Sequence, residues 1–317
     1  MTTLGALGES AVLARIFPRL PQADAQLVGP GDDAAVIAAP DGRYVVTTDM
    51  MIHGPDFRLA WSSPRDLGWK AAASNLADVA AMGAVPSALV VALAAPADTS
   101  IDFLEAFADG LRDGCAELSP GAGVVGGDLS VSDVLTIAVT AFGDLEGRQP
   151  VLRSGAHPGD VVGLAGVPGL AAEGLRLLFE HGVSDGVPDA SAAARVAAEH
   201  PVPVAAQLRP RPPISSGRDA AMAGATAMLD TSDGLAIDAA RIASASGVRL
   251  DVRGLSREEF LGGEDHCLLA TFPSDAQIPE GFRVIGSVAE GSGLSLDGVT
   301  VGGDGWDPYR GWNGGAG

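Results

Sequence analysis

The chain has 317 residues, of which 47% are hydrophobic, and its formal net charge is −20. This charge argues against nucleic acid or an anionic membrane as a partner, and no apolar run approaches the ~20 residues of a membrane span. The amino-terminal residues carry no secretory signal and the two cysteines form no C-x-x-C pattern, so we expect a cytoplasmic location.

The single lysine excludes one familiar nucleotide-binding motif. Lys70 is the only lysine among 20 basic residues, and its surroundings, LGWKAAAS, do not match the G-x-x-x-x-G-K-[ST] phosphate loop. The catalytic loop and the D-F-G motif of protein kinases are also missing from the sequence.

The first half of the chain mixes predicted helices and strands. Apolar periodicity predicts a helix at 8–17 and strands at 34–39 and 44–49, which a turn at 40–42 joins into a hairpin. A long alanine-rich helix follows at 64–82, with Pro64 in its first turn and Gly83 as its C-terminal cap. The remaining elements are a strand at 87–95, a helix at 102–118, the start of a strand at 123–125 and a strand at 134–143.

A polar, turn-rich segment at 144–160 predicts a boundary between two domains, residues 1–145 and residues 146–317. Beyond it we expect a strand at 161–166, a helix at 169–182, a proline-rich loop at 200–215, a helix, a strand at 225–229, a helix at 234–247, and strands near 248–252, 267–272 and 282–289. The alternation predicts an α/β (α+β) fold, with an N-terminal mixed sheet with helices and a C-terminal α/β domain.

Five acidic motifs carry the candidate chemistry: GDD at 31–33, TTD at 47–49, NLAD at 75–78, GGD at 126–128 and DTSDG at 230–234. Any one of them can be a turn or a helix cap, and Asp233 could simply cap the helix that follows it. Lys70, Ser74 and Asp78 share one face of the long helix, and the apolar neighbours of Asp78 argue against a purely solvated position.

Acids gathered in one cleft would repel each other, by roughly 4 kcal/mol for two charges 4 Å apart at an effective dielectric constant near 20. Divalent cations between the carboxylates remove this repulsion, and the neighbouring threonine hydroxyls suit Mg²⁺. Glycines beside Asp128 allow a polyphosphate to approach the backbone. The motifs therefore predict metal-assisted phosphoryl transfer from a nucleotide. Arg153 is the candidate for phosphate charge, or else an ordinary surface arginine.

In their order and spacing these motifs resemble the thiamine-monophosphate kinase family, which belongs with the aminoimidazole-ribonucleotide synthetase-like enzymes. The matching segments are GESAVLARIF, GPGDDAAV, TTDM, KAAASNLADVAAMGAVP, GGDLS, LRSGAHPGD, DTSDGL, GGED and GWDPY. The resemblance implies that thiamine monophosphate and ATP are converted to thiamine diphosphate and ADP with Mg²⁺. It also implies a homodimer that pairs through the N-terminal sheets, with the C-terminal domain completing each active site.

The resemblance implies roles for individual residues. Several Mg²⁺ ions would be held by Asp33, Thr47, Thr48, Asp49, Asp78, Asp128, Asp230 and Asp233, whereas the turn alone accounts for Asp32. Nucleotide contacts would come from Gly127, Asp128, Arg153 and Ser232. Contacts with thiamine phosphate would come from Asp56, Glu264 and Trp306. Asp49, Asp128 and Asp233 are the expected catalytic residues.

Two segments depart from the family pattern. Asp56 stands in GPDF where many relatives have histidine, and His266-Cys267 follows GGED where many have an aromatic residue and glutamate. Two alternatives stay open from the sequence. One is another ATP-dependent enzyme of the same superfamily, such as an amidine-forming purine synthetase or a selenophosphate synthetase. The other is a non-catalytic protein that binds divalent cations.

Overall fold

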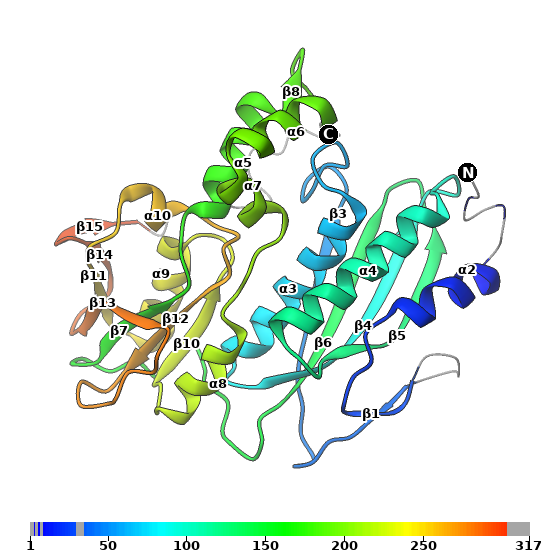
Figure 1. The fold of residues 1–317 in the computed structure, drawn as a ribbon. Helices are drawn as coiled ribbons and strands as arrows, with labels where there is room; N and C mark the ends of the chain where they lie inside the picture. The colour runs from blue at the N-terminus through cyan, green and yellow to red at the C-terminus, as the bar shows by residue number, and fades with distance from the viewer. Residues whose placement is uncertain (1–2, 4–5, 7–8, 30–34, 303–317) are drawn as a thin grey trace.

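The computed structural model describes residues 3, 6, 9–29 and 35–302 (Figure 1). In the first half the elements are α2 (Glu9–Ile16), the 3-10 turn η1 (Phe17–Arg19), β1 (Gln26–Val28), β2 (Val36–Ile37), β3 (Val45–Ile52), α3 (Pro64–Ala81), β4 (Val85–Ala95), α4 (Ile101–Leu118), β5 (Gly123–Val131) and β6 (Thr136–Asp144). In the second half they are β7 (Val161–Ala165), α5 (Leu170–His181), β8 (Val183–Ser184), β9 (Val187–Pro188), α6 (Ala190–Glu199), α7 (Pro201–Leu208), α8 (Ile214–Met222), β10 (Ala227–Thr231), α9 (Leu235–Ser246), β11 (Arg249–Val252), α10 (Arg257–Leu261), β12 (Cys267–Phe272), β13 (Phe282–Ala289), β14 (Gly293–Leu296) and β15 (Val299–Val301).

Two main sheets organise the described part of the chain. The first has four strands in the order β3-β6-β4-β5, and the second has seven in the order β10-β12-β7-β13-β11-β14-β15. In the first sheet β4 and β5 run parallel, whereas β6 runs antiparallel to both β3 and β4. The predicted α/β class, with a mixed sheet in the first half, is confirmed.

The predicted hairpin between residues 34–39 and 44–49 is wrong. Strand β2 pairs with β1 instead, in a small separate sheet. Strand β3 pairs along its whole length with β6, from Val45 opposite Gly143 to Ile52 opposite Thr136. A two-residue strand offers β3 few backbone partners, so the long antiparallel pairing with a strand far along the chain prevails.

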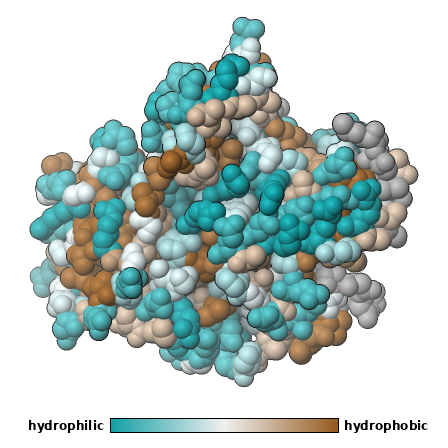
Figure 2. Space-filling view, viewed as in Figure 1, coloured by the Kyte–Doolittle hydropathy of each residue, from teal (hydrophilic) through white to brown (hydrophobic). Residues whose placement is uncertain are grey.

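Helix α3 is the central helix of the first half. Ser63 and Asp66 form a capping box at its start, and Gly83, with φ of 73°, follows its end, as predicted. It packs so closely on α4 that a Cβ at Gly68 would lie 2.0 Å from the Phe107 carbonyl oxygen. Helix α4 turns a hydrophilic face outward (Figure 2), with ion pairs such as Arg19–Asp109. Helix α3 is therefore buried between α4 and the four-stranded sheet.

The predicted proline-rich loop at 200–215 is in part a helix, α7, which begins at Pro201. Both Pro201 and Pro203 fall in the first turn, where a missing N–H breaks no helical hydrogen bond. The prolines therefore mark a helix start rather than a loop.

The two halves meet along α3, which packs on both β10 and α8. The approach is close enough that a Cβ at Gly217 would lie 2.1 Å from the Ala80 carbonyl oxygen. Side chains of α3 therefore contact the second half directly, as Lys70 does with Glu264 and Ser74 with His266. Within the residues described, no helix combines the length and apolar character needed to cross a membrane.

Candidate active site

Strand β3 divides the TTD motif between the two faces of its sheet. Thr47 donates a hydrogen bond from Oγ1 to Asp78 Oδ2 on α3 at 3.0 Å. Asp49 lies on the same face because side chains alternate along a strand. Thr48 points to the other face, where its hydroxyl donates to the Val139 carbonyl oxygen at 3.0 Å. The structure therefore brings Thr47 and Asp49 toward Asp78 but not Thr48.

Asp78 and Asp230 bring carboxylates from the two halves together. Burial raises the pKa of Asp78 to about 7, and the nearby charge of Asp230 adds to the shift, while the hydrogen bond from Thr47 opposes it. Asp230, at the end of β10, is only 6% exposed. Two poorly solvated carboxylates and a hydroxyl in one region offer the hard oxygen ligands that Mg²⁺ prefers.

The imidazole ring of His266 lies between Asp230 and Ser74. Its Nδ1 lies 3.1 Å from Asp230 Oδ2, and its Nε2 lies 3.2 Å from Ser74 Oγ on α3. Burial alone would lower the pKa of His266, but the hydrogen bond and charge of Asp230 raise it above its usual value. The histidine that departs from the family pattern thus links the second half to α3 beside the carboxylate pair.

Asp233 is compensated by an arginine in the same chain. Arg241 Nη2 lies 2.7 Å from Asp233 Oδ2, and its Nη1 lies 2.6 Å from Asp238 Oδ1. Asp238 is 1% exposed, and burial raises its pKa to about 6 against the opposing charge of Arg241. Asp238 was not among the predicted site residues. Its position on the apolar face of α9, beside Leu235 and Ala239, was the available signal.

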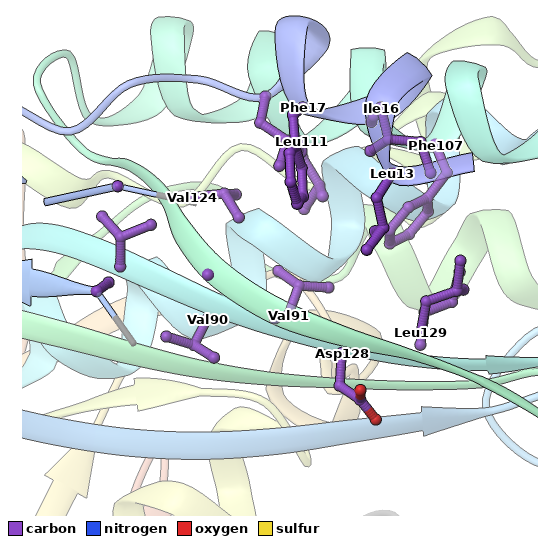
Figure 3. Close-up of a pocket in the computed structure, with 18 of the residues that line it drawn as sticks. Leu13, Ile16, Phe17, Val90, Val91, Phe107, Leu111, Val124, Asp128 and Leu129 are labelled. Atoms are coloured by element: carbon purple, nitrogen blue, oxygen red, sulfur yellow. The ribbon is translucent and has the colours of Figure 1, made fainter. Parts of the chain in front are cut away.

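The GGD motif borders an apolar cavity of about 970 Å³ between β4, β5, α2 and α4 (Figure 3). Leu13, Phe107 and Leu111 line it, while the Asp128 carboxylate lies at its edge and turns away from them (Figure 3). A Cβ at Gly127 would lie 2.0 Å from the Val91 carbonyl oxygen. This glycine is therefore required by the approach of β4, whatever else it contacts.

Asp128 does not join Asp49 and Asp78 within one chain. It pairs across β4 and β6 with Ala92, Ala138 and Met50, so it lies on the outer face of the sheet with Thr48. Strands β3 and β5 are the two edges of this sheet. Three strand spacings, or roughly 14 Å, separate them.

Asp56 and Glu264, the predicted substrate residues, lie close enough for their charges to interact. Burial raises the pKa of Asp56, the charges of Glu264 and Asp49 raise it further, and Lys70 lowers it. Glu264 Oε2 accepts hydrogen bonds from Lys70 Nζ at 2.5 Å and Gln207 Nε2 at 2.8 Å. Lys70, which the sequence marked as the sole lysine and placed on one helix face with Ser74 and Asp78, thus belongs to this side of the site.

The other predicted site residues have fewer side-chain contacts or lie outside the described part of the chain. Ser232 lies in the loop between β10 and α9, and its carbonyl oxygen accepts a hydrogen bond from the Glu264 N–H at 2.8 Å. Arg153 is exposed, and its guanidinium forms no ion pair within the described residues. Asp33 and Trp306 lie outside the described residues. No group of three or more His, Cys, Asp or Glu that could by itself hold a metal occurs in the described part.

Comparison with known proteins assigns the chain to a family. A family model described as AIR synthase related protein, N-terminal domain, matches residues 31–145. The thiamine-monophosphate kinase of Mycobacterium tuberculosis is 41% identical over 330 residues, covering 98% of this chain and 92% of the relative. The chain belongs to the thiamine-monophosphate kinase family. A second member, from Corynebacterium glutamicum, is 42% identical over 311 residues, covering 91% of this chain and 88% of the relative.

A solved structure of the thiamine-monophosphate kinase family shares the fold. AaThiL complexed with AMPPCP and TMP is 30% identical, with a TM-score of 0.71, covering 83% of this chain and 86% of that one. The family resemblance drawn from the acidic motifs is therefore confirmed. Lys70, Ser74 and His266 were not predicted as site residues of this kinase-family chain, because their contacts cross between the halves.

Proposed function

We propose that this protein transfers the γ-phosphoryl group of ATP to thiamine monophosphate, producing thiamine diphosphate and ADP. The observation that carries this conclusion is the 41% identity with a thiamine-monophosphate kinase over 98% of the chain. AaThiL was complexed with AMPPCP, an ATP analogue, and with TMP. A related fold therefore accepts a nucleotide and a phosphorylated acceptor together.

We also propose that several Mg²⁺ ions are cofactors, held by Asp33, Thr47, Thr48, Asp49, Asp78, Asp128, Asp230 and Asp233. The strongest support is Asp78, because it accepts a hydrogen bond from the Thr47 hydroxyl, the nearby charge of Asp230 acts on it, and burial disfavours its negative charge. Mg²⁺ bound here would neutralise both the carboxylates and the phosphate oxygens. One or two carboxylates a site suffice for Mg²⁺ when phosphates supply other ligands.

For the nucleotide, we propose contacts from Gly127, Asp128, Arg153 and Ser232. The cavity of about 970 Å³ beside Gly127 is lined mainly by apolar side chains, which suits a purine base. The exposed guanidinium of Arg153 has no ion-pair partner within the described residues, so it is available to a phosphate.

For the acceptor, Asp56 and Glu264 would face the cationic thiazolium ring, and Trp306 would stack on the aromatic rings. The acceptor phosphate is already anionic near neutral pH, so the chain needs no nucleophile or strong base of its own. Its task is to align two phosphates and offset their repulsion, with Asp49, Asp128 and Asp233 as the catalytic residues.

The outer face of the four-stranded sheet supports a homodimer. Val46 and Met50 on this face are 59% and 53% exposed, which is unusual for large apolar side chains on a sheet. Thr48 and Asp128 share the face but lie at opposite edges. Two such sheets packed face to face would bring the partner's Asp128 toward Thr48, on the edge strand β3 that also carries Asp49. Residues 1–145 would then bind ATP and Mg²⁺ and form the dimer, and residues 146–317 would complete each site.

The test is phosphate transfer to thiamine monophosphate, measured by chromatography of thiamine diphosphate and ADP with and without Mg²⁺. We expect equal amounts of both products, and only with Mg²⁺. ADP release only with other acceptors would identify a different ATP-dependent enzyme of the superfamily. Binding of Mg²⁺ without nucleotide, measured by calorimetry, would identify a non-catalytic cation-binding protein.

We also propose that the protein is cytoplasmic and has no nucleic-acid partner.

Removing one catalytic carboxylate should abolish transfer while the fold survives. We expect Asp49→Asn and Asp128→Asn each to lower kcat by at least about 100-fold, the scale of losing one charge-stabilising group. Asp98→Asn, in an exposed turn, is the control and should leave kcat unchanged. Near-wild-type kcat in both variants at saturating Mg²⁺ would sink the assignment.

A further inference from the structure

Lys70 is buried on the acceptor side of the site. It is 8% exposed, and its Nζ donates to Glu264 Oε2 at 2.5 Å and to the Gln207 carbonyl oxygen at 3.2 Å. Lysine is almost never this buried without a charged partner. The ion pair with Glu264 is therefore a fixed part of the contact between α3 and the second half.

Glu264 is anchored through only one of its carboxylate oxygens. Gln207 on α7 donates to Oε2 at 2.8 Å, the same oxygen that Lys70 contacts. The described hydrogen bonds to this carboxylate all reach Oε2, and the side chain stays 36% exposed. The other oxygen, Oε1, is therefore open to a ligand.

The backbone at Glu264 is held in a conformation that favours glycine. Its φ is 66°, although glycines at 262 and 263 precede it directly. Its N–H donates to the Ser232 carbonyl oxygen at 2.8 Å, which fixes the turn. A glutamate kept at a strained position and bonded through its side chain to two helices indicates a functional constraint.

We propose that Lys70 is a positioning residue for the acceptor, holding the Glu264 carboxylate so that its free oxygen faces the cationic ring of thiamine phosphate. This role rests on the proposed function. It differs from a direct phosphate contact, because Lys70 would act through Glu264 rather than on the substrate itself.

The charges around Glu264 explain why a lysine is needed. Asp56, Asp265 and His266 are the other titratable groups in its electrostatic surroundings. Burial raises the pKa of Glu264, but the charge and hydrogen bond of Lys70 bring it below its usual value. Without Lys70 the neighbouring charges of Asp56 and Glu264 would oppose each other uncompensated, and a protonated carboxyl group attracts a cation weakly.

The experiment compares Lys70→Met with Lys70→Arg, Glu264→Gln and the double variant Lys70→Met/Glu264→Gln. We expect Lys70→Met to raise KM for thiamine phosphate by about ten- to a hundredfold, the scale of one hydrogen bond to a charged group, with KM for ATP little changed. Lys70→Arg should recover part of the loss. Arg176→Met, which breaks an exposed ion pair on α5, is the control and should change neither KM.

The double variant separates positioning from direct contact. If Lys70 acts through Glu264, the double variant should be no worse than Glu264→Gln alone. Fully additive losses, or equal rises in KM for both substrates, would overturn the proposal. The acid limb of kcat/KM for thiamine phosphate should also move to higher pH in Lys70→Met, because Glu264 then protonates more readily. If the wild-type protein makes no thiamine diphosphate, the proposed function fails instead.

A second measurement does not depend on a folded variant. Lys70 is the only lysine, so reductive methylation of the wild-type protein labels this side chain and the α-amino group. Saturating thiamine phosphate should slow labelling of Lys70 severalfold and leave the α-amino group unaffected, as read by mass spectrometry. Equal labelling of Lys70 with and without bound thiamine phosphate, with binding verified by calorimetry, would contradict the proposal.

Discussion

At the scale of single residues, the carboxylates of the site differ in whether the chain itself compensates them. Asp233 forms an ion pair with Arg241, and Glu264 forms one with Lys70. Asp78 accepts a hydrogen bond from Thr47 and Asp230 lies beside His266, and within the described residues neither carboxylate is paired with an arginine or the lysine. The charge of Asp230 raises the pKa of Asp78, and a cation between the two carboxylates would offset their repulsion. The compensated acids are better suited to hold their position before ligands arrive.

Asp238 gives a prediction about pH. Its pKa in the folded chain is raised to about 6 from an ordinary 3.8, so the folded state binds this proton more tightly than the unfolded state. Its contribution to stability is therefore present at pH 4 and lost as pH rises through 6. Relative to Asp238→Asn, the wild-type protein should lose roughly 1–3 kcal/mol of unfolding free energy over this interval.

The measurement is urea unfolding of both proteins between pH 4 and 7 with a metal chelator present. The chelator keeps cation binding from contributing to the difference. Parallel stability curves for the two proteins would show that Asp238 titrates normally.

At the scale of elements, the long helices were the most predictable part of the fold. The helix expected at 64–82 spans Pro64–Ala81, and the one expected at 102–118 spans Ile101–Leu118. Their signals are local, namely caps, glycines and apolar spacing. Strand pairing is set by residues far apart in sequence, which is why the hairpin was predicted wrongly and the pairing of β3 with β6 was not foreseen.

Strand β5 offers a matched pair of glycines. A Cβ at Gly127 would lie 2.0 Å from the Val91 carbonyl oxygen, whereas a Cβ at Gly126 would meet only the Ala35 Cβ at 4.0 Å. We expect Gly127→Ala to destabilise the protein by about 1–3 kcal/mol, as overpacking does, and to raise KM for ATP by moving Asp128. Gly126→Ala should cost far less stability. Equal melting temperatures for the two variants would show that β5 shifts without strain.

At the scale of the whole molecule, the face-to-face dimer predicts complementation between two inactive variants. Asp49→Asn and Asp128→Asn, unfolded together and refolded as a mixture, should recover about a quarter of wild-type activity, because half of the dimers are mixed and each has one intact site. If Asp49 and Asp128 served the same site within one chain, every site in the mixture would be inactive. No recovery, with mixed dimers verified by mass spectrometry, would exclude a shared site.

The family, the acidic motifs and the long helices could all be predicted from the sequence, because order, spacing and periodicity are properties of the chain alone. Which acids lie near one another depends instead on how distant segments pack. Lys70, Ser74 and Asp78 were seen to share a helix face, but their partners Glu264, His266 and Thr47 come from distant segments. Alternation along β3 and β5 then separated Thr48 and Asp128 from Thr47 and Asp49. Burial and nearby charge arise only when these segments pack, so the raised pKa of Asp78 could not be read from its motif.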